Sequence, residues 1–316
     1  MKGLKVKGYK VNKLSTPGKV NKHSLFERIA DMNDRALAAV LLAPAFVFIS
    51  LVIVYPVVTL LLQSFQDVRL LTGNPSRWVG IENYALVMGD PQFWRAVKNT
   101  LIIVIITVPG SLVFGLGLAL LANMPFKWRG PIRLALLLPW AMPLAFVGLT
   151  FAWFFHSEYG VINDVLRRIG IAPQVWFNSA ALTMMAICIA TIWKTSSFMA
   201  LILLAGLQTI PKSLYEAAEV DGASHATQFF EITLPLLVPS ILVALIFRTL
   251  TAIQSFDIPY SMPGPGEETQ TLAMYIHANA VDYLDLGYSS ALAVVMFVLS
   301  MATTFVYLRY VRGDTK

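Results

Sequence analysis

The chain has 316 residues, of which 57% are hydrophobic and 13% are charged, and its formal net charge is +6. Soluble domains usually carry about a quarter charged residues, so the composition excludes an ordinary soluble protein and indicates an integral membrane protein. The single cysteine, Cys188, excludes an internal disulfide and a metal site built on cysteines.

The N-terminal region is polar and basic. Nine of the 24 Lys and Arg residues lie in the first 35 positions. This clustering explains the positive net charge, so the charge does not indicate a nucleic-acid partner. This stretch is too long and too polar to be the basic head of a signal peptide. We therefore expect a basic cytoplasmic tail over residues 1–35, a transmembrane domain over residues 36–310 and a short cytoplasmic tail over residues 311–316.

Apolar segments long enough to span a bilayer define the expected fold. A spanning helix needs about 20 mostly apolar residues, and six segments meet this length, which predicts an all-α integral membrane protein with six transmembrane helices. They are Ala36–Leu62, Leu101–Asn123, Leu134–Phe155, Ala180–Leu207, Ile232–Gln254 and Tyr288–Leu308.

The basic residues near these segments predict the orientation. With the N-terminus inside, 16 Lys and Arg residues lie on the inner side and six in the outer loops, so both termini are expected to be cytoplasmic. The loop over residues 211–235 is the exception, because it contains one Lys and four acids. The number of spans before and after this loop places it on the cytoplasmic side.

Two local patterns predict details around the second span. Ser111, Gly115 and Ala119 recur every four residues, and such a row of small side chains lets helices pack closely in lipid. Asp90 precedes Pro91, which favours an extended residue leading into a helix.

The polar loop over residues 211–235 reads as two short helices joined by a tight turn. Ser213 and Glu216 are spaced as a capping box for the first helix. Gly222 is expected to end it in a left-handed conformation, and Ser224 is expected to cap a second helix that continues into the fifth span. Small residues at the turn favour a docking surface for another protein, and the alternatives are an interfacial helix or a simple connection.

Two charged residues lie inside predicted spans. Lys194 falls near the middle of the fourth span, where an unpaired charge costs at least about 2.5–3.5 kcal/mol, so it should face a partner subunit or line a wet translocation path. Arg248 in the fifth span is closer to the outer side and is expected to snorkel or to line the same path. The candidate residues for a translocation path are Trp140, Trp193, Lys194, Ser197, Arg248, Gln254 and Asp257.

The stretch EAAEVDGASHATQFFEITLP, from Glu216 to Pro235, resembles without a gap the EAA signature of membrane subunits of binding-protein-dependent ABC importers. The resemblance to the maltose and glycerol-phosphate type of sugar permease covers the chain from about Leu41 to Tyr307. The turn after the fifth span departs from it, because this turn reads Met262-Pro263-Gly264-Pro265-Gly266 where the family often has Gly-Gly-Pro. Further stretches that resemble the family are Val79–Tyr84, Asp90–Asn99, Leu138–Ala141, Trp193-Lys194, Phe198-Met199, Ala205–Leu207, Phe256-Asp257 and Asp285–Ala291.

This resemblance implies a type I ABC importer permease bundle with a cytoplasmic coupling helix, and a sugar or related polyol as substrate. It implies alternating access driven by two ATPase subunits, which bind ATP and Mg²⁺, so no cofactor is expected in this chain. The other implied partners are a second permease subunit, an extracytoplasmic substrate-binding protein received by the outer loops Gln63–Lys98 and Ser255–Gly287, and membrane lipid. The residues implied to couple to the ATPase are Glu216, Ala217, Ala218, Asp221, Gly222 and Ala223.

Missing motifs bear on the other function classes. The sequence contains no GxxxxGK[ST] phosphate loop, no HExxH metal spacing and no GxSxG nucleophile elbow. A stand-alone gradient-driven carrier or channel would need broken helices and mid-membrane carboxylates. A lipid-modifying membrane enzyme would need clustered His, Asp or Ser at the interface. An ATP-driven importer at the cell membrane therefore remains the favoured interpretation.

Overall fold

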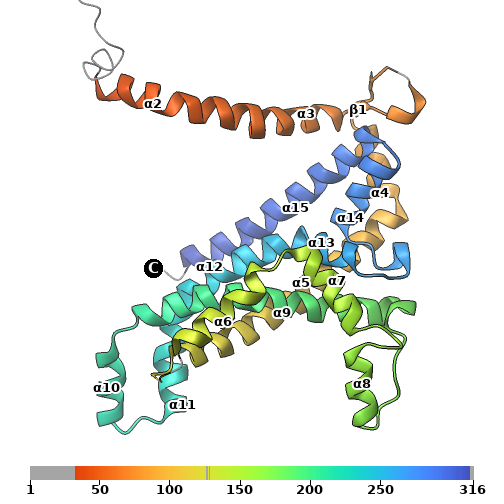
Figure 1. Ribbon diagram of the computed structural model, residues 1–316. Coiled ribbons are helices and arrows are strands. Elements are labelled where there is room, and N and C mark those ends of the chain that lie inside the picture. The colour runs from red at the N-terminus through yellow and green to blue at the C-terminus, as the bar shows by residue number, and fades with distance from the viewer. Residues whose placement is uncertain (1–32, 74, 126, 128, 314–316) are drawn as a thin grey trace, which may run out of the picture. The chain divides into compact units, whose positions relative to one another are not determined.

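The computed structural model describes residues 33–73, 75–125, 127 and 129–313 (Figure 1). Most of the expected N-terminal tail, residues 1–32, and residues 314–316 of the expected C-terminal tail lie outside this part of the chain. The chain divides at Val58 into two units, and each is described by itself.

The first unit contains most of one long apolar helix. Its parts are α2 (Asp34–Ile49), the π-helical turn η1 (Ser50–Val54) and α3 (Tyr55–Gln63), which together run from Asp34 to Gln63. The side chain of Asn33 caps its start by accepting from the Ala36 amide at 2.8 Å. The mean hydropathy of its most apolar window is 2.9, as expected for a membrane-spanning helix. The prediction of a first span over Ala36–Leu62 is confirmed to within two residues at each end.

The second unit carries the remaining helices and one small antiparallel sheet of β1 and β2. Its elements are β1 (Gln66–Asp67), η2 (Leu70–Thr72), β2 (Arg77–Trp78), α4 (Glu82–Gly89), α5 (Pro91–Asn123), α6 (Arg129–Ala141), α7 (Leu144–Phe154), α8 (Val161–Arg168), η3 (Trp176–Asn178), α9 (Ala180–Thr209), α10 (Lys212–Val220), α11 (His225–Thr227), η4 (Gln228–Thr233), α12 (Leu234–Ile253), α13 (Asp257–Ser261), η5 (Gly266–Glu268), α14 (Leu272–His277), η6 (Ala278–Asp282) and α15 (Leu286–Gly313).

Five helices in the described residues are long and apolar enough to span a membrane, and a sixth span is broken. The prediction of one helix over Leu134–Phe155 is wrong, because α6 and α7 meet at an angle of 94°. The break follows from Pro143, which has no amide hydrogen and disfavours a helical conformation at Met142. If the bent pair counts as one span, the predicted number of six is confirmed.

The small-residue row on the second span forms a close helix contact, as predicted, and the structure identifies its partner as the fourth span. A β-carbon at Gly115 would lie 2.6 Å from the Cβ of Met199 and 3.0 Å from the carbonyl oxygen of Ser196, so only glycine fits there. Ser111 hydrogen-bonds the hydroxyl of Thr195 at 2.7 Å. Close contact of α5 with α9 therefore forms the centre of this unit.

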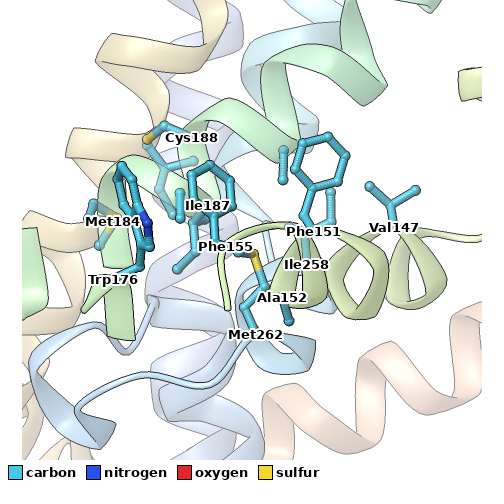
Figure 2. Close-up of a cluster of buried hydrophobic side chains, with 13 residues drawn as sticks. Val147, Phe151, Ala152, Phe155, Trp176, Met184, Ile187, Cys188, Ile258 and Met262 are labelled. Atoms are coloured by element: carbon cyan, nitrogen blue, oxygen red, sulfur yellow. The ribbon is translucent and has the colours of Figure 1, made fainter. Parts of the chain in front are cut away.

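Three apolar clusters surround this contact. The cluster in Figure 2 joins α7, η3, α9 and α13, and Phe155 packs edge-on against Trp176 with ring centroids 4.8 Å apart. A second cluster joins the later parts of α5 and α9 to α6 and α12. The third joins α4, the start of α5, α14 and α15. The clusters hold in place the helices that carry the candidate site residues.

Candidate functional site

The two outer loops predicted to receive a binding protein are joined to each other. Arg69 forms ion pairs with Asp67 and Asp285, at 3.1 and 3.2 Å. The amide of Leu286 donates to the carbonyl of Val68 at 2.8 Å. Gly287 is required at this crossing, since a β-carbon there would lie 2.1 Å from the carbonyl oxygen of Gln66.

A half-buried carboxylate, that of Asp90, holds the same region together. Asp90 is extended and caps α5 by accepting from the amide of Gln92 at 2.8 Å, which confirms the prediction for the Asp-Pro pair. Its Oδ2 also accepts from the hydroxyls of Tyr275 and Tyr288, the latter at 2.7 Å. Burial alone raises the pKa of Asp90, but the hydrogen bonds outweigh it and lower the pKa below its usual range. Burial and the bond to Asp90 raise the pKa of Tyr275 to about 12, so its hydroxyl stays a donor.

Replacing Asp90 with alanine should destabilise this outer region. The change leaves two tyrosine hydroxyls without their acceptor and removes a helix cap, so the free energy of unfolding should fall by about 2–3 kcal/mol. Because the folded-state pKa is depressed, the wild-type carboxylate stabilises the fold fully above pH ~4 and progressively less as the pH falls through the folded-state value. Thermal unfolding in detergent at pH 6 checks the loss, and equal melting temperatures for the two proteins would contradict it.

The lysine inside the fourth span has a partner within the chain. Lys194 is 6% exposed, lies at the midpoint of α9, and its Nζ donates to the backbone carbonyl of Trp140 near the end of α6. The last carbonyls of a helix carry partial negative charge and lack intrahelical donors, so a cation there is favourable. Lys194 therefore caps α6 at the break in the third span.

A hollow lies beside this contact. It has a volume of about 490 Å³ and is lined by Pro139, Trp193 and Ser197 among others. The ring of Trp193 is 42% exposed, whereas the side chain of Ser197 is buried. The structure thus gathers Trp140, Trp193, Lys194 and Ser197 from the predicted path residues around the break.

Arg248 is placed differently from the prediction. It does not snorkel, because it is only 3% exposed and its guanidinium donates to Thr107, the central residue of α5, and to Thr251 at 3.3 Å. Its Nε is buried without a hydrogen-bond partner, and none of the described carboxylates forms an ion pair with it. The remaining two path candidates, Gln254 and Asp257, are exposed at the end of α12 and the start of α13.

The loop over residues 211–235, called the coupling loop below, projects from the adjoining ends of α9 and α12 (Figure 1). The capping-box prediction is wrong, because Pro211 takes the N-cap position in an extended conformation and Ser213 lies inside α10. The turn is as predicted: Gly222 has a φ of +77°, and the amide of Ala223 bonds the carbonyl of Ala218 at 2.9 Å. Ser224 caps α11 by accepting from the amide of Thr227 at 3.2 Å.

The surface of the coupling loop consists of small and acidic side chains. Glu216, Ala217, Asp221 and Gly222 are exposed, and Ala218 and Ala223 are partly buried. Sequence reasoning missed Val220, whose side chain is 88% exposed at the end of α10. An apolar residue among polar neighbours was the available signal. A bond of 2.9 Å between the hydroxyls of Tyr215 and Thr233 holds α10 against η4.

Comparison with known proteins assigns the family. Residues 111–313 match the family described as the binding-protein-dependent transport system inner membrane component. The chain belongs to this family. It is therefore a membrane component of an ABC importer and a transport protein rather than an enzyme, as predicted.

Individual relatives of this permease cover nearly its whole length. It is 62% identical over 287 residues to the sulfoquinovosyl glycerol transport system permease protein SmoG of Agrobacterium fabrum, covering 90% of this chain and 93% of that protein. It is 37% identical over 278 residues to the trehalose/maltose transport system permease protein MalF of Thermococcus litoralis, covering 87% and 94%.

A solved structure has the same fold as this permease. A chain of the bacterial alginate ABC transporter, crystallised with an alginate pentasaccharide-bound periplasmic protein, superposes with a TM-score of 0.78 at 23% identity, covering 92% of this chain and 98% of that one. This likeness concerns the fold and confirms the type I importer architecture. A carrier acting alone would combine broken helices with mid-membrane carboxylates; the permease has the broken helix, but no acid lies in the core of a span.

Proposed function

We propose that this permease forms half of the translocation pathway for a sugar in an ATP-driven importer. The support is its identity to permeases whose names specify sulfoquinovosyl glycerol and trehalose or maltose. The substrate class is a disaccharide, oligosaccharide, polyol or glycosyl glycerol, and sulfoquinovosyl glycerol is the first compound to test.

The other half of the pathway comes from a second permease subunit, and two ATPase subunits drive transport. They bind ATP and Mg²⁺ and dock on the exposed residues Glu216, Ala217, Asp221 and Gly222 of the coupling loop, with Ala218 and Ala223 beneath them. Both chain termini lie in the cytoplasm, since the basic residues concentrate on that side, and the order of the spans places this loop on the same side. The acidic surface and the apolar Val220 side chain suit a cleft with basic and apolar walls.

An extracytoplasmic binding protein delivers the sugar to the joined outer loops. Exposed aromatic side chains are typical of interface anchors, and Trp78 is 61% and Tyr283 57% exposed on this side. The sugar then passes the break between α6 and α7. Trp140 and Trp193 offer aromatic faces to the sugar, and Lys194 and Ser197 lie behind them. Arg248 contributes a polar group on α12. Gln254 and Asp257 contribute polar groups at the outer end of the path.

Uptake by the reconstituted importer tests this function. The permease is co-expressed with its partner subunits, placed in proteoliposomes with ATP inside, and supplied with binding protein and labelled sulfoquinovosyl glycerol, trehalose or maltose outside. We expect ATP-dependent uptake of one of these sugars, at least about tenfold above a sample without ATP. Sugar uptake by the permease alone, without ATPase subunits, would contradict the proposal.

A further inference from the structure

Two adjoining hollows follow the seam between α5 and α9. The first, nearer the starts of both helices, has a volume of about 620 Å³, and the second is the hollow of about 490 Å³ beside the break. Ile189 and Ile192 line both of them, so the two hollows adjoin, and together they are called the α5–α9 groove below. Each volume falls within the range of small-molecule sites.

The walls of the first hollow are apolar along most of its length. Ile102, Ile106, Met184 and Met185 lie along them, and the buried Cys188 adds a further weakly polar side chain. A sugar needs a hydrogen-bond partner for most of its hydroxyls, and these walls offer few. Their chemistry suits a long hydrocarbon chain.

One end of the groove is cationic. Arg95 and Lys98 line it, are exposed, and lie three residues apart on one face of α5. Neither forms an ion pair with a described carboxylate. Glu268 also lines this end, which leaves an excess of one positive charge.

The length of α5 sets the depth of these cations. Its 33 residues extend about 50 Å, whereas the hydrocarbon core of a bilayer is about 30 Å thick. The first turns of α5, with Arg95 and Lys98, therefore lie at the level of the lipid headgroups, and the apolar walls lie at the level of the acyl chains.

We propose that the α5–α9 groove binds an anionic phospholipid. The phosphate contacts Arg95 and Lys98, and one acyl chain lies along the seam past Ile106 toward Ile192. This inference is independent of the transported substrate. A helix of the second permease subunit is the competing occupant, but apolar helix contacts would leave the excess positive charge at the mouth uncompensated, whereas a phosphate neutralises it.

Lipid retention by the assembled importer tests the site. The complex is purified from nanodiscs containing phosphatidylcholine and phosphatidylglycerol, washed with detergent, and its bound phosphatidylglycerol is quantified by mass spectrometry. The variants are the double change R95Q/K98Q, which removes the headgroup contacts, and I106W, which fills the chain-binding part. The matched control R168Q removes an exposed cation that lines neither hollow.

We expect wild type and R168Q to retain phosphatidylglycerol, and R95Q/K98Q and I106W to retain at least fivefold less, with the subunits still assembled. Equal retention in all four proteins would overturn the site. Displacement of the lipid by soluble glycerol phosphate would show that a free phosphate ester suffices, which overturns binding through the acyl chain. Loss of the second permease from I106W without loss of lipid would assign the groove to a subunit interface instead.

Discussion

Reversing the charge of Glu216 should abolish sugar uptake while leaving the permease in the membrane. Glu216 is exposed on α10. Its replacement by lysine breaks no intrachain ion pair among the described residues, so folding and insertion should be unaffected. A lysine facing a basic docking cleft would be repelled and would leave the ATPase unattached. We expect uptake to fall at least tenfold, measured in proteoliposomes, and the ATPase to be lost on co-purification.

The matched control is Glu158→Lys, which makes the same charge reversal at an exposed position far from the coupling loop. This variant should transport and co-purify as wild type does. Normal uptake and normal ATPase association in Glu216→Lys would contradict the assignment of the coupling residues.

The substitution Gly222→Asp also tests whether the coupling loop binds the ATPase. No atom lies within 4 Å of a β-carbon at position 222, so the added side chain meets nothing inside the chain. Aspartate and asparagine both tolerate the left-handed conformation of this turn better than most residues. Gly222→Asn therefore separates the added charge from the added bulk, and a larger loss of ATPase binding in Gly222→Asp than in Gly222→Asn would identify charge as the cause.

Replacing Lys194 with methionine should impair transport without impairing insertion. Methionine removes a mid-membrane charge that costs about 2.5–3.5 kcal/mol on insertion scales, so insertion should be at least as efficient. The carbonyl of Trp140 loses its donor, at a cost of about 1–3 kcal/mol, and the angle between α6 and α7 is no longer held. We expect uptake to fall at least tenfold.

The distance between α6 and α7 distinguishes the two possible roles of Lys194, as a cap of α6 or as a residue of the translocation path. Spin labels at the exposed positions Leu134 on α6 and Leu149 on α7 report this distance by electron paramagnetic resonance. If Lys194 is a cap, Lys194→Met broadens the distance distribution, and Lys194→Arg, which keeps a donor, restores part of it. A narrow, unchanged distribution with an altered KM for the sugar would place Lys194 in the path instead and contradict the cap.

The spans were predictable because a bilayer imposes a length and an apolar composition that can be read residue by residue. The turn at Gly222 and the cap at Ser224 were also predictable, since both depend on local chemistry. The capping box predicted at Ser213 is absent because Pro211, two residues earlier, already supplies the extended residue at the start of α10.

Other features depend on contacts that no local pattern encodes. The break at Pro143 was missed because an apolar count ignores geometry, and membrane helices often tolerate proline. The partner of Lys194 is a backbone carbonyl 54 positions away, and Asp90 meets tyrosines 185 and 198 positions away. Arg248 was expected to snorkel or to line the path, but it donates to the hydroxyls of Thr107 on α5 and of Thr251 on its own helix inside the bundle.

The continuity from α11 through η4 to α12 has a mechanical consequence. His225–Ile253 is one helix of 29 residues, about 44 Å long, with the turn at Gly222 at one end and Arg248 near the other. A tilt of about 10° about the end at the coupling loop would move the other end of this helix by about 8 Å. This helix can bend at the π-helical turn Gln228–Thr233 and at Pro239. A small movement of the coupling loop would thus reach the far end of α12 without passing through a loop.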